Sequence, residues 1–158
     1  MYRIFASQIL PTQSCTMSVK LSLTPVRQFD QAGLMVYVDS EHWIKTGIEV
    51  VDGKPRLSCV VTNEFSDWST QPWEALDLEI RVSQFGNGSY VVEAKMSGNG
   101  AVEDIWSFIR ISHLRISKKD QLIHFGVFGC CPEKQDGCEI KFSEFNIVDG
   151  VTFDHKSV

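Results

Sequence analysis

Apolar and polar residues alternate along most of this chain with a period of two. Such alternation is typical of β-strands that bury one face, and no apolar stripe at helical spacing runs for more than about one turn. Clusters of turn-forming residues separate the alternating segments, for example at 52–55 and 86–88. The ten predicted strands span residues 2–9, 15–24, 32–39, 43–51, 56–63, 74–83, 89–97, 105–112, 121–130 and 138–148. Strands of this number and spacing predict a sandwich or a barrel.

The segment 43–51 shows how the alternation assigns side chains to faces. Successive residues of a strand point to opposite sides of the sheet. The core side carries three aliphatic residues, Ile44, Ile48 and Val50. The other side carries Trp43, Lys45 and Glu49, and the sequence therefore predicts that these three share an exposed face.

The side-chain patterns of two other segments predict where each segment lies in its sheet. In 74–83 an aliphatic side opposes Asp77, Glu79 and Arg81, which is typical of an antiparallel sheet with one solvated face. In 105–112 isoleucines on one side oppose Trp106, Phe108 and Arg110 on the other. Because apolar bulk lies on both sides of 105–112, we expect it to be a central strand.

The composition narrows the class of protein. At 158 residues, with 43% hydrophobic and 22% charged residues, the chain is typical of a single globular domain over residues 1–158. Its net charge is −5 and its longest basic run is Lys118 and Lys119, so we expect no nucleic-acid partner. No apolar run is long enough for a membrane span or for the core of a signal peptide. An odd number of cysteines without a secretory signal indicates a reducing compartment, and we expect the protein to be cytoplasmic.

Three carboxylates, Glu74, Asp77 and Glu79, form a first candidate site. Asp77 and Glu79 are two positions apart on a strand, so their carboxylates share a face at about 7 Å. That spacing is compatible with acid and nucleophile roles in glycoside hydrolysis. A solvated strand face gives the same pattern, with Arg81 as an ion-pair neighbour, and this surface interpretation is the stronger one.

A second candidate joins Trp43, Lys45 and Glu49 with the Ser-Asp-Trp-Ser segment at 66–69, which we expect to be a loop. Indole faces stack on flat apolar ligand surfaces, and neighbouring charged groups supply directional hydrogen bonds. Alternatively, Trp43 and Trp68 cover the edge of the core while Lys45 and Glu49 form a surface ion pair. Residue chemistry alone leaves both interpretations open.

The thiols Cys130, Cys131 and Cys138 form a third group. Structural zinc uses two pairs of closely spaced ligands, whereas adjacent cysteines on a strand point to opposite faces. We therefore expect no metal and no cofactor, and we expect all five cysteines to be reduced.

Four segments occur in an order that resembles a known family. They are 29–35 (Phe-Asp-Gln-Ala-Gly-Leu-Met), 43–49 (Trp-Ile-Lys-Thr-Gly-Ile-Glu), 57–62 (Leu-Ser-Cys-Val-Val-Thr) and 66–69 (Ser-Asp-Trp-Ser). The series resembles the uncharacterised concanavalin A-like sandwich proteins that include the regulation-of-enolase protein of fungi. A weaker match extends the likeness over residues 15–148.

The resemblance implies an all-β, concanavalin A-like jelly roll of two packed antiparallel sheets, one of them concave. It also implies a set of ligand-binding residues, at positions that match the family pattern: Gln31, Trp43, Lys45, Glu49, Thr62, Asp67, Trp68 and Arg110. Members of this family carry a further N-terminal segment with a tryptophan-rich start, which would be missing from a chain that opens at Met1. The family has no established general activity, and a fold does not determine function.

We expect a binding or regulatory domain whose concave face recognises a carbohydrate or a protein partner such as a metabolic enzyme. The alternative is a glycoside hydrolase or lyase that uses paired carboxylates, with Glu49 and Asp67 the first candidates and Glu79 the third, and whether the chain is an enzyme stays open. Carboxylates about 5–10 Å apart in a groove beside Trp43 or Trp68 would favour catalysis. Because Glu49 and Arg110 both point outward, we also expect them to meet on the polar face.

Overall fold

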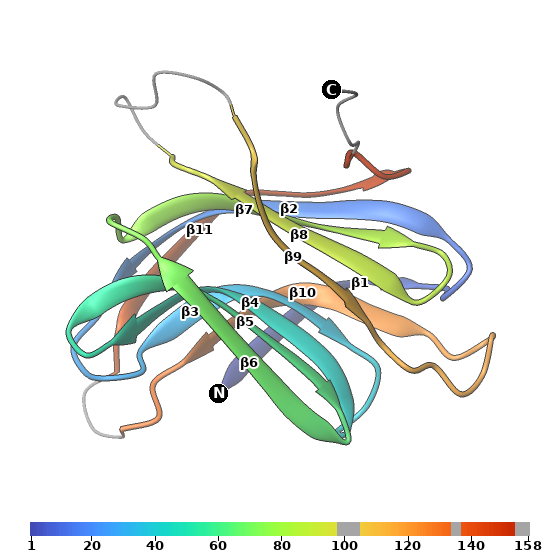
Figure 1. Cartoon of the computed structure of the whole chain (residues 1–158), viewed down its shortest axis with the longest axis horizontal. Coiled ribbons are helices and arrows are strands. Elements are labelled where there is room, and N and C mark those ends of the chain that lie inside the picture. The colour runs from blue at the N-terminus through green and yellow to red at the C-terminus, as the bar shows by residue number, and fades with distance from the viewer. Residues whose placement is uncertain (98–104, 134–136, 154–158) are drawn as a thin grey trace.

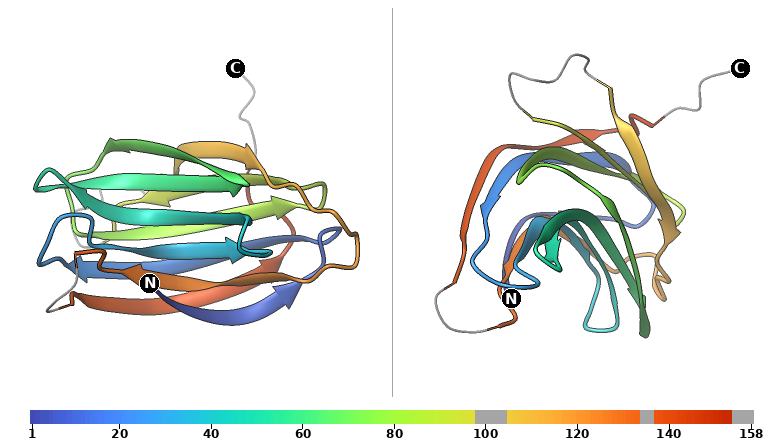
Figure 2. Two further views of the ribbon diagram at one scale, coloured as in Figure 1. Left: turned by 90° about the horizontal axis from the view of Figure 1, so that it is seen from below. Right: turned by 60° about the vertical axis from the view of Figure 1, so that its left-hand side comes forward.

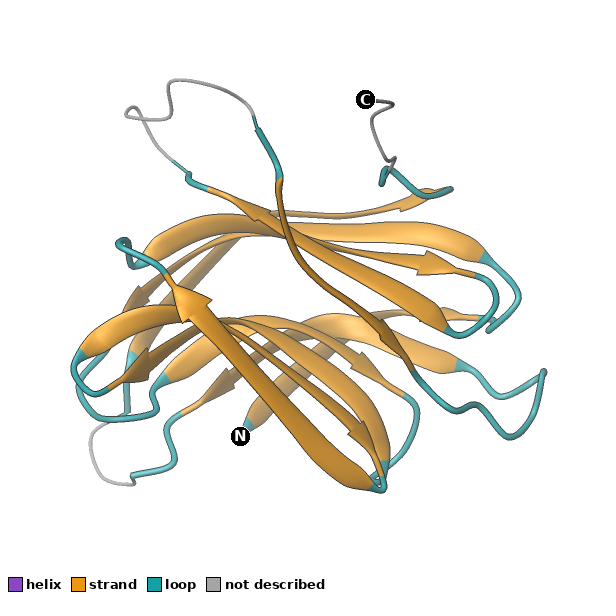
Figure 3. Cartoon of the chain, in the orientation of Figure 1, coloured by secondary structure: helices purple, strands orange, loops and turns teal. Residues whose placement is uncertain are grey.

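The computed structural model describes residues 1–97, 105–133 and 137–153. Their regular structure consists entirely of strands joined by turns and loops (Figure 3). In chain order the strands are β1 (Tyr2–Ile9), β2 (Ser14–Thr24), β3 (Gln31–Tyr37), β4 (His42–Val51), β5 (Lys54–Asn63), β6 (Phe65–Pro72), β7 (Asp77–Phe85), β8 (Ser89–Lys95), β9 (Ser107–His113), β10 (Ile123–Cys130) and β11 (Glu139–Asp149).

The strands form two antiparallel sheets that lie one above the other (Figure 1). Sheet A has six strands in the order β1-β10-β3-β4-β5-β6, and sheet B has five in the order β11-β2-β7-β8-β9. Neighbours in space are often distant in sequence, since β10 lies between β1 and β3, and β11 pairs with β2. This is the concanavalin A-like jelly-roll sandwich that the family resemblance implies, and the fold prediction is confirmed.

The core fills the space between the sheets with the alternate residues of each strand. Ile44 and Ile48 of sheet A and Ile80 and Val82 of sheet B are fully buried, as their alternation predicts. Burial of each such side chain contributes about 1.5–3 kcal/mol relative to exposure. The residues between them point outward, so the pattern that builds the core also selects the side chains of each outer face.

Sheet A is strongly curved, and two facing glycines permit the curvature. Both sheets bend in the same direction with sheet A on the inside, which makes its outer face concave (Figure 2). Gly33 of β3 and Gly47 of β4 are register partners. A Cβ added at Gly33 would lie 1.9 Å from the backbone oxygen of Thr46, and one at Gly47 would lie 2.0 Å from that of Ala32. No side chain fits there, so bare backbone forms the middle of the concave face.

The segment 66–69 is not the loop that the sequence predicts, because it belongs to β6 at the edge of sheet A. Small polar residues dominate this strand, and its exposure leaves it without the apolar alternation that marks a strand with one buried face. Backbone pairing with β5 holds this segment as a strand, and the hydrophobic pattern of the segment does not reveal that pairing. The strand predicted at 74–83 begins at Asp77, which leaves Glu74 exposed in the connection before it.

Strand β9 is an edge strand of sheet B, whereas the sequence predicts a central one. Its apolar side chains do not indicate burial on both sides, since Phe108 and Ile111 are exposed. β9 and β6 lie at the same open side of the sandwich, each at the end of its own sheet (Figure 1). The contacts between these two edges decide where one part of the predicted site lies.

Candidate functional site: the concave outer face of sheet A

Six of the eight residues that the sequence assigns to a binding site lie on the outer face of sheet A. They come from four neighbouring strands and are Gln31, Trp43, Lys45, Glu49, Thr62 and Trp68. Alternation places them there, because their chain neighbours Ala32, Ile44, Ile48 and Val61 are buried in the core. The concave face in Figure 2 therefore carries most of the predicted site.

A chain of side-chain hydrogen bonds joins four of these residues. The Lys45 ammonium donates to Gln31 Oε1 at 2.6 Å. The Gln31 amide in turn donates to Glu49 Oε1 at 3.1 Å and to the Phe29 backbone oxygen at 3.1 Å. Gln31 is 4% exposed and Glu49 6%, so these polar groups are held below the surface of the face. Buried polar groups with several partners have little freedom to move, which gives the face a defined arrangement.

The second oxygen of Glu49 accepts a hydrogen bond from Trp68. Trp68 Nε1 lies 3.2 Å from Glu49 Oε2 and 3.0 Å from Ser58 Oγ, so its N–H is shared between two acceptors. The indole is fixed at its polar edge while 51% of the residue remains exposed. A fixed aromatic ring that is open to solvent beside buried polar groups is typical of a ligand-stacking position.

The glycine pair determines how the Lys45 side chain lies. In the register of β3 and β4, Gly33 and Gly47 come between the pair Gln31 and Glu49 and the pair Met35 and Lys45. Lys45 must cross the glycine backbone to reach Gln31 Oε1. A larger residue at either glycine would occupy the space that this side chain uses. The floor of the face is therefore main chain, with the ammonium and the amide above it.

Aromatic rings from β1, β3, β4 and β10 lie beside the hydrogen-bonded residues. The Lys45 ammonium lies 6.0 Å from the ring centres of both Trp43 and Phe128, at the outer limit of cation–π attraction. Farther along, Phe5, Tyr37 and His124 pack ring against ring with centroids 5.2–6.3 Å apart. Arg3 covers the Tyr37 ring at 4.8 Å.

Thr62 and Ser58 are polar positions of β5 on the same face. Thr62 is the register partner of Trp43, and its hydroxyl lies 2.8 Å from Ser66 Oγ across the β5–β6 pair. Ser58, which is not among the predicted site residues, is buried and accepts the Trp68 N–H. In the predicted strand 56–63, Ser58 lies on the same side as Thr62, and this alternation is the signal that could have identified it.

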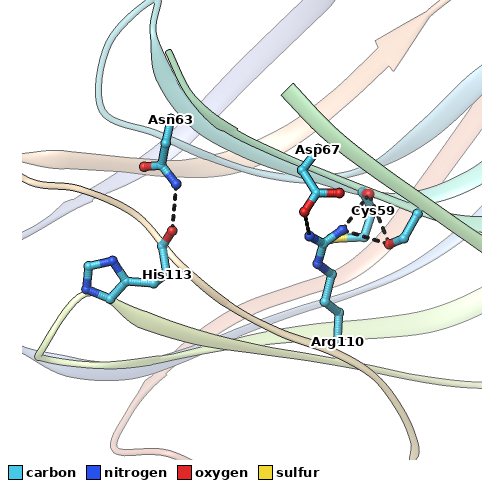
Figure 4. Close-up of polar contacts among 6 residues, drawn as sticks. Cys59, Asn63, Asp67, Arg110 and His113 are labelled. Atoms are coloured by element: carbon cyan, nitrogen blue, oxygen red, sulfur yellow. Dashed lines mark hydrogen bonds and ion pairs between the residues drawn. The ribbon is translucent and has the colours of Figure 1, made fainter. Parts of the chain in front are cut away.

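Asp67 and Arg110, the other two predicted residues, lie away from this face. Asp67 is the register partner of Val61, whose side chain is buried in the core. Its side chain therefore points to the core side of β6, opposite to that of Trp68. Arg110 reaches across from β9 in sheet B and donates to Asp67 Oδ2 at 2.6 Å and to Ser69 Oγ at 2.8 Å (Figure 4). The prediction that Glu49 and Arg110 meet on the polar face is therefore wrong, because each is bonded to a different set of partners on a different side of β6.

The Arg110 contacts belong to a wider link between the two edge strands. Asn63, at the end of β5, donates to the His113 backbone oxygen at 2.8 Å (Figure 4). It also accepts from the Arg115 backbone N–H at 2.8 Å. Together these bonds close the open side of the sandwich. They support β6, the strand that presents Trp68.

The carboxylates of the sequence do not assemble into a catalytic pair in sheet A. Glu49 and Asp67 are the two acidic residues in its strands, and they point to opposite sides. On the outer face of sheet B, Glu79 pairs with Lys95 at 3.1 Å and Asp77 accepts from Ser97 Oγ at 2.8 Å. The surface interpretation of Asp77 and Glu79 thus agrees with their partners.

The cysteines divide into buried and half-buried groups. Burial raises the pKa of both Cys15 and Cys59 to about 11, so these thiols are protonated and unreactive at neutral pH. Cys131 and Cys138 are half-buried, with their sulfurs 3.0 Å apart. The Asp30 carboxylate completes a group whose ligand atoms lie within 4.8 Å of one another. The sequence pattern does not predict this group, because its three residues come from separate segments of the chain.

Comparison with known proteins shows which family the chain belongs to. One protein family, described as Protein of unknown function (DUF1349), matches residues 5–149. The chain belongs to this family. Regulation of enolase protein 1 of Saccharomyces cerevisiae is 35% identical over 123 residues, which cover 75% of this chain and 56% of that protein. The resemblance seen in the sequence is thereby confirmed, although the chain spans only about half the length of this curated relative.

Solved structures show the same sandwich. A functionally unknown protein from Saccharomyces cerevisiae superposes with a TM-score of 0.76 at 28% identity, covering 91% of this chain and 74% of that one. A GH43 protein from Bacillus licheniformis gives a TM-score of 0.73 at 14% identity, over 87% of this chain and 28% of its own. The alginate lyase from Klebsiella pneumoniae gives 0.53 at 12% identity, over 89% and 61%. At such low identity, the last two likenesses show the shared fold alone.

The described residues contain no helix that is long and apolar enough to cross a membrane.

Proposed function

We propose that this chain is a binding domain that recognises a carbohydrate through the concave outer face of sheet A and does not hydrolyse it. The observation that carries the proposal is the position of Trp68, whose indole is half exposed while its N–H is fixed by buried Glu49 and Ser58. A sugar ring offers an apolar C–H face for stacking and hydroxyl groups at its rim. An anchored indole beside polar groups complements both.

The polar groups of the face have hydrogen-bonding capacity left for a ligand. An ammonium has three N–H donors, and one from Lys45 goes to Gln31 in the described contacts. Each Glu49 carboxylate oxygen accepts one described hydrogen bond, although it has two lone pairs. Sugar hydroxyl groups both donate and accept, so they can use both groups. A sugar would meet donors and acceptors that are already oriented.

The charges of the face favour an acidic glycan over a neutral one. Arg3, Lys45 and Arg56 project on this face, and Glu49 is the single carboxylate that the described strands place there, although the whole chain has a net charge of −5. We expect an anionic sugar to bind more tightly than its neutral counterpart, and its affinity to fall with added salt.

Binding without hydrolysis follows from the positions of the acidic residues in sheet A. Glycoside hydrolysis in its usual form uses two carboxyl groups on either side of the scissile bond. Among the described strands of sheet A, none places a second carboxylate beside Glu49 on the outer face, and Asp67 is paired with Arg110 on the other side of β6. This arrangement supports recognition rather than acid–base catalysis.

A glycan array followed by calorimetry on the best ligand tests the proposal. Trp68→Ala should weaken binding roughly tenfold, since stacking on an indole contributes on the order of 1 kcal/mol. Phe65→Ala is the matched control, because Phe65 lies on β6 with the opposite parity and is 85% exposed. Glu49→Gln, which keeps the shape of the side chain, should also weaken binding.

The outcomes separate the alternatives. Equal affinity in Trp68→Ala and the native chain, with both folded, would show that this face is not the site. Turnover of a polysaccharide that disappears in Glu49→Gln with the fold intact would show that the chain is an enzyme.

A protein partner is the second candidate function, favoured by the name of the relative in Saccharomyces cerevisiae, Regulation of enolase protein 1. Under this alternative the same face contacts a metabolic enzyme in the cytoplasm. Affinity purification from an extract would then recover one enzyme with the native chain and with Phe65→Ala, and lose it with Trp68→Ala. The glycan array would show no binding.

A further inference from the structure

Cys131 and Cys138 bring two thiols together at the junction of the two sheets. Their sulfurs lie 3.0 Å apart, and the residues are seven positions apart in sequence. Cys131 directly follows the last residue of β10, in sheet A, and Cys138 directly precedes the first residue of β11, in sheet B. A disulfide has an S–S bond of about 2.05 Å, so a shift of about 1 Å would allow this bond to form.

The surroundings distinguish this pair from the other three cysteines. Cys15 is 2% exposed and Cys59 1%, so an oxidant in solution does not reach them. Cys130 is half-buried, but as the chain neighbour of Cys131 it points to the opposite side of β10, beside its register partner Gln31. The pair therefore combines proximity with access.

We propose that Cys131 and Cys138 are an oxidation site, and that low-molecular-weight disulfides of the glutathione class convert them into a reversible bond that links sheet A to sheet B. The proposal does not rest on the proposed function. It adds a redox-dependent link at the end of β10, next to Asp30 and the binding-face residue Gln31.

The exchange balances in two steps. The Cys131 thiolate attacks one sulfur of the small disulfide, forms a mixed disulfide and releases one thiolate. Cys138 then gives its proton to solvent and attacks Cys131 Sγ, which forms the protein disulfide and releases the second thiolate. Two electrons and two protons pass from the pair to the small disulfide, which becomes two thiols.

The surroundings of Cys138 suit it to the second step of this exchange. Burial, the hydrogen bond with Cys131 and the nearby Asp30 carboxylate raise the pKa of Cys138 to about 12. Cys138 is thus protonated at neutral pH and suits the second step, in which it loses its proton as it attacks. Cys138 then acts as the resolving thiol.

A metal site is the competing interpretation, and the distances disfavour it. Two thiolates on tetrahedral zinc, each at about 2.3 Å, lie about 3.8 Å apart. The observed separation of 3.0 Å is shorter. The third group, Asp30, is already engaged, because its Oδ2 accepts the backbone N–H groups of Val26 at 2.8 Å and Arg27 at 2.9 Å.

The test equilibrates the reduced chain with glutathione disulfide in excess over glutathione and then counts thiols after denaturation. We expect five thiols to fall to three, since two of the five enter the bond, and dithiothreitol to restore five. Cleavage after Lys134 places Cys131 and Cys138 in different tryptic peptides, 120–134 and 135–141. Mass spectrometry should therefore find these peptides joined before reduction and separate after it.

Cys130→Ser is the matched control for the pair. It should still lose two thiols, whereas Cys131→Ser and Cys138→Ser should lose none to an internal bond. Oxidation should also raise the Tm of the native chain by about 5 °C, because the link restricts the unfolded chain. Two results would overturn the proposal: five thiols retained in the native chain, or one zinc ion held by the reduced chain and lost in both Cys131→Ser and Cys138→Ser.

Discussion

The outer faces of the two sheets are built from the same alternation but handle their polar groups differently. On sheet B, charged side chains satisfy one another: Arg81 pairs with Glu93 at 2.6 Å, and Lys95 pairs with Glu79 at 3.1 Å. Trp106 covers both cations, with its ring 4.0 Å from the Arg81 guanidinium and 4.8 Å from the Lys95 ammonium. The aromatic ring on this face is occupied by the protein's own cations.

On the outer face of sheet A, the carboxylate of Glu49 is buried and is held by an amide and an indole, with no ion pair in the described part of the chain. The exposed indole of Trp68 carries no cation over its ring among the described contacts. The two faces thus differ in whether the ring of their tryptophan already carries a cation of the protein: that of Trp106 does, and that of Trp68 does not among the described contacts. A face that leaves an anchored aromatic ring open is the better candidate for ligand recognition.

The largest expected effect concerns the floor of the concave face. Gly33→Ala should lower the free energy of unfolding by about 3 kcal/mol, because the new Cβ meets main chain that cannot move without separating β3 from β4. Gly129→Ala is the matched control, since its Cβ meets only the end of the Ile140 side chain, at 2.4 Å. It should cost about 1 kcal/mol. Urea denaturation of both variants measures the difference, and equal losses would contradict the role of the glycine pair in the curvature.

The next effect contrasts two glutamates, one on each outer face. Glu49→Ala should cost about 2 kcal/mol, because it takes a partner from the buried amide of Gln31 and from the Trp68 N–H. Glu79→Ala should cost about 1 kcal/mol, because it removes one half-buried ion pair on the outer face of sheet B. Denaturation curves at neutral pH measure both losses. A larger loss for Glu79→Ala would show that the buried network of sheet A contributes less to stability than the ion pairs of sheet B.

The smallest effect concerns the two tryptophans. Trp106→Ala should cost about 0.5–1 kcal/mol through its lost contacts with Arg81 and Lys95. It should leave the affinity for any ligand of sheet A unchanged, while Trp68→Ala weakens that affinity. Calorimetry of both variants with one ligand makes the comparison. A loss of affinity in Trp106→Ala would place the working surface on sheet B.

Local pattern predicted much of the fold and the side chains of one face. The period of two predicted ten of the eleven strands in the described part of the chain. It also assigned Ile44, Ile48, Lys45 and Glu49 to the correct sides of β4. These assignments hold because the side-chain direction in a strand depends only on position within that strand. The missed strand, β6, consists mostly of small polar residues, so its alternation carries no hydrophobic signal.

The sequence by itself determined the all-β class, the buried and outward positions of the strands, and the presence of Trp43, Lys45 and Glu49 on one face. Only the tertiary structure decided that β9 lies at an edge, that Arg110 binds Asp67 rather than approaching Glu49, and that Cys131 meets Cys138. The reason is physical. Alternation is a local property of one strand, whereas strand order and contacts between sheets depend on which distant segments pair, and no single segment encodes that choice.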